Sequence, residues 1–151
     1  MILVPFEKAP DLIGSMVKRG HVLLSAQKGS LRTDRDALKV SDSSTPIFGI
    51  QEDDGVMIGV VDYSQNLAHQ SIRFHIAFER GTVDDIRKAV RMLQRMAATS
   101  GAIKINLVVM SDHDSLADSL RELGFAPEVR MRQHSFVGGQ LVSISEYGCI
   151  L

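Results

Sequence analysis

His75 and Glu79 are the residues best suited to move a proton, and both lie on the polar face of one predicted strand. Polar and apolar residues alternate over residues 70–79, which is typical of a strand with one face on a core and the other near solvent or a site. An imidazole and a carboxylate on that polar face are candidate general bases. The alternative is a solvated strand face, with Glu79 exposed and His75 hydrogen-bonded to a neighbour.

The cysteine and the histidines limit the metal chemistry of the chain. Cys149 is the only cysteine, so an intrachain disulfide and a cysteine-based metal cluster are excluded. Nothing near it in the sequence would activate a thiol, so we expect a buried strand position. His69 and His75 have no cysteine nearby, and no metal site is predicted.

The segments around this strand predict a sheet and a long helix. Apolar runs at 47–50 and 56–63 flank Asp54-Gly55, a pair that favours a two-residue hairpin turn of type I′. After the strand at 70–79, Thr82 and Asp85 have the form of a capping box at the start of a helix, which Gly101 ends. The buried stripe of this helix is Ile86, Ala89, Val90, Leu93, Met96 and Ala97.

The remainder of the chain predicts further strands and one more helix. A nearly continuous apolar run at 103–110 indicates a strand covered on both faces. A short helix follows, capped by Asp114 or Ser115 and closed by Gly124. Strands at 128–137 and 141–150 are joined by Gly138-Gly139.

The long helix between two strands implies a parallel pair with a right-handed crossover. The expected fold class is α/β, more strictly α+β. It is a mixed, mostly antiparallel, twisted sheet of about six to seven strands with helices on both faces.

The first 45 residues carry fewer signals. Residues 2–4 predict a short strand that ends at Pro5, and Leu12 to Val17 predict a short helix closed by Gly20. The apolar run at 21–25 is strand or helix by periodicity alone. Residues 34–40 form either a helix capped by Thr33 or part of a polar loop.

Length and charge exclude several classes of protein. The 151 residues are 44% hydrophobic and 23% charged, which is ordinary for one globular domain spanning 1–151. No apolar run reaches the length of a membrane span, and the N-terminus has no basic region typical of a secretory signal. With 17 basic and 18 acidic residues, no global field attracts nucleic acid. We expect a cytoplasmic protein that binds neither membrane nor nucleic acid.

Four segments form an ordered set of motifs. They are the hairpin with Ile47-Phe48-Gly49-Ile50 and Met57-Ile58-Gly59-Val60, the strand end Ile76-Ala77-Phe78 before the long helix, the helix that closes with Leu123-Gly124-Phe125, and the terminal hairpin from Arg130 to Ile150. In this order and at this spacing they resemble the GNAT family of CoA-dependent N-acyltransferases, from Pro46 to Ile150.

The resemblance implies a site between two diverging strands. In the family, backbone groups of the fourth strand hold the acyl carbonyl and the pantetheine of acetyl-CoA, here around Ile76 and Phe78. The pyrophosphate sits on a Gln/Arg-x-x-Gly-x-Gly/Ala loop at the start of the next helix. The matching segment supplies Arg80, Gly81 and Thr82, with Arg87 one turn further on.

The chain departs from the family pattern in its chemically specific positions. Val83 and Asp85 replace the two glycines of the loop, and Asp84 adds a second carboxylate that would repel a pyrophosphate. Leu120 stands where many members have a tyrosine that protonates the thiolate. His113 stands where an asparagine is common. The fold expectation survives these changes, whereas the acetyl-CoA inference is weakened.

Within this family the polar residues acquire possible roles beside their structural alternatives. The resemblance makes His75 and Glu79 candidate bases for the attacking amine, and Ser111, His113 and Tyr147 are conceivable proton donors. Arg87, Lys88, Arg91 and Arg95 lie on the polar side of the long helix, where the first three could meet CoA phosphates or an acidic carrier protein. Arg130, Arg132 and His134 alternate along a late strand and could contact an anionic substrate. The alternative for both groups is a solvated face.

Two functions from different classes remain. The first is an acyl-CoA-dependent N-acyltransferase that moves an acetyl group to a small-molecule or peptide amine by direct attack. The alternative is a catalytically inactive module with this fold that binds no CoA and assembles, for example as a homodimer through the edge of the terminal hairpin. A carrier-protein thioester as donor is a third possibility.

Overall fold

The structure of the protein is a computed structural model in which residues 1–18, 46–110, 114–137 and 140–151 are described. The elements in chain order are β1 (Ile2–Pro5), a 3-10 turn (Phe6–Lys8), α1 (Pro10–Lys18), β2 (Ile47–Gln51), β3 (Met57–Asn66), a 3-10 turn (Leu67–His69), β4 (Ser71–Phe78), α3 (Val83–Thr99), β5 (Lys104–Met110), α4 (Asp114–Glu122), β6 (Ala126–Val137) and β7 (Gln140–Ile150).

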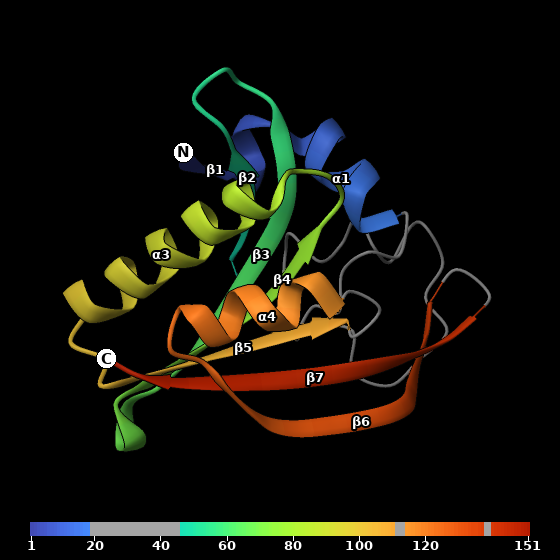
Figure 1. The fold of residues 1–151 in the computed structure, drawn as a ribbon. Helices are drawn as coiled ribbons and strands as arrows, with labels where there is room; N and C mark the ends of the chain where they lie inside the picture. Colours follow the sequence, from blue (N-terminus) through green and yellow to red (C-terminus); the bar gives the residue numbers. More distant parts are fainter. Residues whose placement is uncertain (19–45, 111–113, 138–139) are drawn as a thin grey trace.

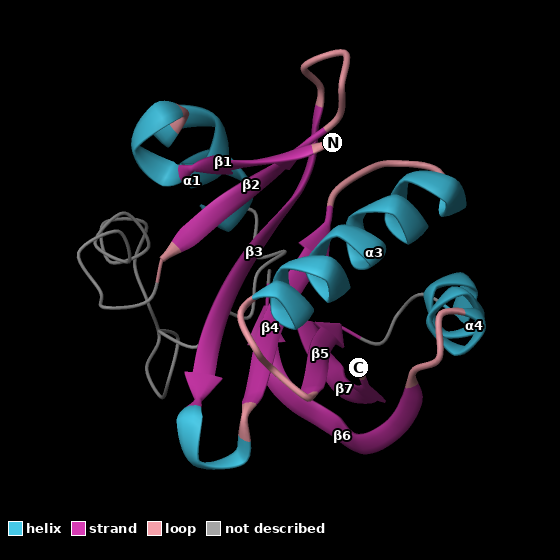
Figure 2. Cartoon of the chain, turned by 90° about the vertical axis from the view of Figure 1, so that its left-hand side faces the viewer, coloured by secondary structure: helices cyan, strands magenta, loops and turns pink. Residues whose placement is uncertain are grey.

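The described strands form one seven-stranded sheet in the order β1-β2-β3-β4-β5-β7-β6. β4 and β5 run parallel, and every other neighbouring pair is antiparallel. Helices α3 and α4 lie on one face of the sheet and α1 lies on the other, as Figures 1 and 2 show. The expected mixed sheet with helices on both faces is therefore confirmed.

Two apolar clusters hold the helices against the sheet. The larger cluster packs the buried stripe of α3 (Ala89, Val90, Leu93 and Ala97) and Leu116 and Leu120 of α4 on one face. The smaller cluster packs Ile13 and Met16 of α1 on the other face. Cys149 lies on β7 at the edge of the larger cluster, so its predicted buried strand position is confirmed. No helix in the described residues is long and apolar enough to cross a bilayer.

Helix α3 begins where its sequence predicts. The Thr82 side chain accepts a hydrogen bond from the Asp85 amide, and the Asp85 carboxylate accepts one from the Thr82 amide. Both halves of the capping box are therefore present, and they satisfy two backbone donors that the first turn leaves without helical partners.

The turn between β2 and β3 is not the predicted type I′. The Gly55 amide donates to the Glu52 carbonyl and the Glu52 amide donates to the Val56 carbonyl. Only Gly55 in this turn has a positive φ, of 89°. This pattern is a type I turn followed by a left-handed glycine, the usual form of a three-residue hairpin loop. The hairpin itself is confirmed.

Other predictions fall partly outside the described residues or need new bounds. Strand β3 extends to Asn66, three residues beyond the predicted end, because its polar final residues pair with the start of β4. At the other end of this strand pair, Gly59 permits the close approach of β4, since a Cβ there would meet the Ala77 carbonyl oxygen at 2.6 Å. The expectations for Gly20, for 21–25 and 34–40, and for Gly138-Gly139 lie outside the described residues.

Candidate active site

Strands β4 and β5 pair for only part of their length. Their parallel register runs from Ser71↔Lys104 to His75↔Val108. Beyond this point β4 continues to Phe78 against β3, and β5 continues to Met110 against β7. Figure 1 shows the two strands separating at these ends. The sheet therefore opens immediately after His75, which is the divergence that the resemblance implied.

The backbone of Ile76 and Phe78 faces this opening. The Glu79 amide donates to the Ile58 carbonyl at 2.9 Å, on the β3 side. Because the direction of backbone groups alternates along a strand, those of Ile76 and Phe78 turn toward β5. The edge that they form extends past the last β4–β5 pair. It can offer hydrogen bonds to an extended group that enters the opening.

His75 and Asp62 form a close pair at the start of the opening. They are direct partners across β3 and β4, and His75 Nδ1 lies 2.7 Å from Asp62 Oδ1. The Asp62 side chain is fully buried (0% exposed) and that of His75 is 15% exposed. The Asp62 carboxylate accepts a hydrogen bond from Nδ1–H in this arrangement, so Nε2 keeps the lone pair that a general base needs. Asp62, the hydrogen-bond partner of His75, was not predicted from the sequence.

A network of ion pairs and hydrogen bonds lies on the same face of the sheet, two residues before His75. Arg73 contacts Glu146 Oε1 through Nε at 3.1 Å and through a terminal nitrogen at 3.0 Å. Asn106 donates to Glu146 and to Glu128, each at 2.9 Å, and Lys104 pairs with Glu128 at 2.7 Å. The ammonium of Lys104 is the main cause that lowers the pKa of Glu128. This face of the sheet, beside the paired part of β4 and β5, is therefore polar and held by ion pairs.

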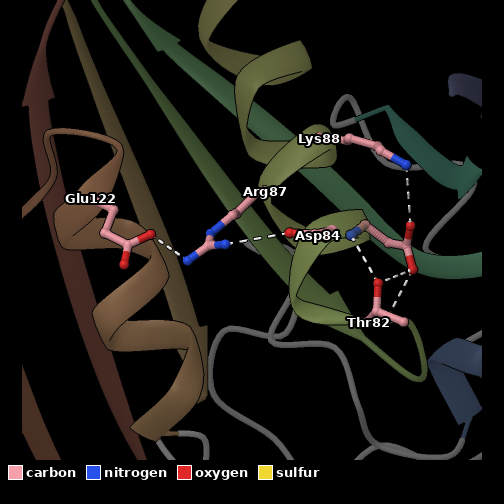
Figure 3. Close-up of polar contacts among 6 residues, drawn as sticks. Thr82, Asp84, Arg87, Lys88 and Glu122 are labelled. Carbon is pink, nitrogen blue, oxygen red and sulfur yellow. Dashed lines mark hydrogen bonds and ion pairs between the residues drawn. The ribbon is translucent and has the colours of Figure 1, made fainter.

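The start of α3 uses its own side chains to satisfy the Thr82 and Asp85 amides. Asp85 Oδ2 accepts from the Thr82 amide at 2.8 Å and from the Thr82 hydroxyl at 2.5 Å, and Lys88 pairs with Asp85 at 3.6 Å. Figure 3 shows these contacts around the first turn of the helix. A carboxylate thus occupies the place at the helix N-terminus where an external anion would bind.

Arg87 and Arg80 are also engaged with the protein. Arg87 contacts Glu122 of α4 and lies 3.3 Å from Asp84, so it links the two helices (Figure 3). Its Nε is buried without a hydrogen-bond partner among the described residues. The Arg80 side chain donates to the Met57 carbonyl at 3.1 Å, and its amide donates to the Ile58 carbonyl at 3.3 Å.

The comparisons with known proteins concern the fold. No model of a protein family and no curated protein matches the sequence. A point mutant of spermidine N-acetyltransferase SpeG from Vibrio cholerae matches with a TM-score of 0.74 at 16% identity, over 99% of this chain and 95% of that chain. The same enzyme in complex with CoA and spermine gives 0.71 at 16% identity, over 99% and 94%. A proposed acetyltransferase from Acinetobacter baylyi ADP1 gives 0.68 at 14%, over 99% and 91%.

The fold is that of the GNAT N-acetyltransferases. Sequence identities this low show the fold and leave the activity open. Within the GNAT fold, the residues predicted for the site fall into two groups. His75, Ile76 and Phe78 lie together at the opening, whereas Arg80, Gly81, Thr82 and Arg87 lie on the loop and the first turns of α3.

The remaining candidates lie in different places around the GNAT fold. Glu79 is half-buried one residue beyond β4, and its backbone continues the pairing with β3. Tyr147 belongs to the cluster beneath α3 and α4, on the opposite face from His75. Leu120 is fully buried in the same cluster. Ser111 and His113 lie outside the described residues.

The two basic groups differ in their surroundings. Lys88, Arg91 and Arg95 line a groove of about 720 Å³ between α3 and Met1, together with Met92 and Met96. Arg130 and Arg132 are exposed on the edge strand β6. His134 lies in the same strand, and its side chain is outside the described part.

The capping carboxylate of Asp85 has a pKa well below its ordinary value. Hydrogen bonds from the Thr82 side chain and amide, then from Glu52, lower the pKa of Asp85 to about 2. The pKa of Glu52 is raised, first because its side chain shares a hydrogen bond with Asp85. The carboxylate at the helix start therefore stays ionised throughout the neutral and mildly acidic range.

Asp85→Asn tests the contribution of this carboxylate to stability. Because the pKa of Asp85 is about 2 in the folded chain and 3.8 in an ordinary aspartate, its stabilising effect is present above pH 3.8 and is lost as the pH falls toward 2. Glu52 acts in the opposite direction, since its pKa is raised. We expect the wild type to lose more free energy of unfolding than Asp85→Asn over this range, measured by urea unfolding at several pH values.

The control for this comparison is Asp118→Asn, an exposed carboxylate on α4. It should leave the acid dependence of the wild type unchanged. Parallel acid profiles for the wild type and Asp85→Asn would show that the capping carboxylate does not contribute to stability.

Proposed function

We propose that the protein is an N-acyltransferase that transfers an acyl group from a thioester to an amine by direct attack, with His75 as the general base. The observation that carries this proposal is the position of the His75–Asp62 pair at the point where β4 and β5 separate. The solved neighbours support the reaction class, because one of them holds CoA and the amine spermine.

The residues at the opening would have separate roles in binding the donor and moving the proton. Backbone donors on the β5-facing edge of β4, at Ile76 and Phe78, would hold the thioester and polarise its carbonyl oxygen as negative charge develops there. His75 Nε2 would accept the proton of the attacking amine, and Asp62 would orient the imidazole and stabilise it once it is protonated. The carbon–nitrogen bond forms, the carbon–sulfur bond breaks, and the thiolate leaves with a proton from solvent.

The acyl donor is acetyl-CoA in our sequence-based prediction, and its two halves fit this chain unequally. The pantetheine arm fits the edge of β4. The pyrophosphate does not fit the start of α3, because Asp85 occupies the amide and hydroxyl donors of Thr82. We therefore assign no step to the nucleotide half of CoA.

The experiment that tests the proposal is an amine-dependent thiol-release assay. Acetyl-CoA, S-acetyl-4′-phosphopantetheine and an acetyl-loaded acyl carrier protein are each offered with a set of alkylamines, polyamines and peptides, and the products are identified by mass spectrometry. We expect release of thiol only when an amine is present, with one acetyl group on the amine nitrogen. Folded protein that acetylates no amine from any donor would overturn the proposal.

A second function is favoured by one specific feature, the carboxylate at the start of α3. A chain that has lost its anion site there and binds no thioester would be a non-catalytic binding or assembly module with a GNAT fold. Self-association measured by light scattering, combined with no donor binding and no transfer, would support this alternative.

A further inference from the structure

This inference rests on the proposed acyl transfer. The edge of β4 favours one part of an acyl donor, and the start of α3 disfavours another. The opening beside Ile76 and Phe78 suits an extended arm, because backbone groups at an open strand edge can bond to the amides of such an arm. The start of α3 offers no equivalent place for a nucleotide, since Thr82 and Asp85 use their amides within the capping box.

Charge around the helix start increases this contrast. Asp84 lies in the first turn of α3 beside Asp85, and Glu52 from the β2–β3 turn is close enough to Asp85 for its own pKa to be raised. CoA brings a pyrophosphate and a ribose phosphate to such a place, whereas a phosphopantetheine arm attached to a protein brings one phosphodiester. Like charges repel, so these carboxylates disfavour the donor that carries the nucleotide.

The groove beside α3 is positively charged, in contrast with the carboxylates at the start of the helix. Lys88, Arg91 and Arg95 line the groove together with Met92 and Met96. Within the described part of the chain, neither Arg91 nor Arg95 forms an ion pair. Cations surrounding flexible, polarisable methionines are suited to an acidic protein surface that presents an apolar side chain.

We infer that the donor is an acyl group carried as a phosphopantetheine thioester on an acidic carrier protein. The carrier docks on the α3 groove at Lys88, Arg91 and Arg95, and its arm enters the opening between β4 and β5. The nucleotide half of CoA adds nothing to recognition by this chain.

The first test compares three acetyl donors with one amine acceptor. We expect kcat/KM for acetyl-CoA and for S-acetyl-4′-phosphopantetheine to agree within about threefold, because the nucleotide is not bound. We expect an acetyl-loaded acidic acyl carrier protein to exceed both by about 100-fold or more. An advantage of about 30-fold or more for acetyl-CoA over acetyl-phosphopantetheine would overturn the inference, as would a carrier no better than the free arm.

The second test addresses the docking surface. The double variant Arg91→Glu with Arg95→Glu should lower kcat/KM for the carrier by about tenfold or more and leave acetyl-phosphopantetheine unchanged, since the groove contacts only the carrier. The matched control is Arg130→Glu with Arg132→Glu on the exposed edge strand β6, which should alter neither donor. An equal loss for both donors, or for both double variants, would contradict docking at α3.

Binding measurements separate this inference from the proposed function. Interferometry with the holo carrier protein reports docking without turnover, and the Arg91→Glu, Arg95→Glu variant should weaken it by about tenfold. No binding of the holo carrier overturns the inference whatever the turnover. If acetyl-CoA is the only donor that supports transfer, the carrier inference is overturned and the proposed N-acyltransferase activity stands. If the carrier binds but no donor supports transfer, the proposed N-acyltransferase activity is overturned and docking of the carrier at α3 stands.

Discussion

Replacing His75 by asparagine will lower kcat for acyl transfer by about 10²- to 10⁴-fold, the usual contribution of a positioned general base. The asparagine amide can donate to Asp62 in place of Nδ1, so the buried carboxylate keeps a partner. It offers no basic nitrogen in place of Nε2. Initial rates at saturating donor and amine measure the effect, and a thermal melt close to that of the wild type shows that the variant is folded.

Two further variants separate the roles around His75. Asp62→Asn should lower kcat on the order of 10²-fold with little change in KM, because Asp62 acts through the imidazole and not on the amine. Glu79→Gln should have a smaller effect than His75→Asn, since the structure shows the paired carboxylate at His75. The reverse order, with His75→Asn close to the wild type and Glu79→Gln inactive, would transfer the role of the base to Glu79.

Replacing Phe74 by alanine will cost about 3–5 kcal/mol of unfolding free energy, a large part of the 5–15 kcal/mol that holds a typical domain together. Phe74 is almost fully buried, lies in the centre of β4, and packs its ring against Tyr63 at a centroid distance of 5.9 Å. It faces the cluster beneath α3 and α4, so truncation leaves a cavity there. Urea unfolding followed by circular dichroism measures the loss.

Two control variants show how much of the stability loss of Phe74→Ala comes from the buried ring. Phe74→Leu keeps most of the apolar volume and should cost about 1–2 kcal/mol. Leu67→Ala removes an apolar side chain that is 83% exposed, and it should change stability by about 0.5 kcal/mol or less. A loss below about 1 kcal/mol for Phe74→Ala would show that the neighbouring side chains collapse into the space.

The sequence was a good guide to the elements, since local periodicity and capping depend on near neighbours in the chain. The alternation over 70–79 appears in the structure, and so does the buried helical stripe except at Met96, which is 40% exposed. The Thr82–Asp85 capping box forms as expected, because its partners are three residues apart. The β2–β3 turn differed because Asp54-Gly55 also suits a longer loop, and the position of Gly55 in the register decides between them.

The candidate site was only half predictable. His75 was found because a titratable group on an alternating strand is visible in the sequence. Asp62 had a signal, a lone carboxylate after the apolar run at 56–61, but nothing in the sequence showed what it would contact. Only the register of β3 on β4 places Asp62 opposite His75. Likewise, only the sheet showed that Tyr147 lies on the opposite face from His75.

By itself, the sequence determined the order of helices and strands, the capping of α3 and the loss of the loop glycines at Val83 and Asp85. These properties depend on residue types and on contacts within a few residues. Tertiary structure alone decided where β4 and β5 separate, that Asp62 pairs with His75, and that Arg87 bridges to Glu122 instead of remaining available to a phosphate. Each of these joins residues at least 13 positions apart, and pairings at that range are set by sheet register and helix packing, which local patterns do not encode.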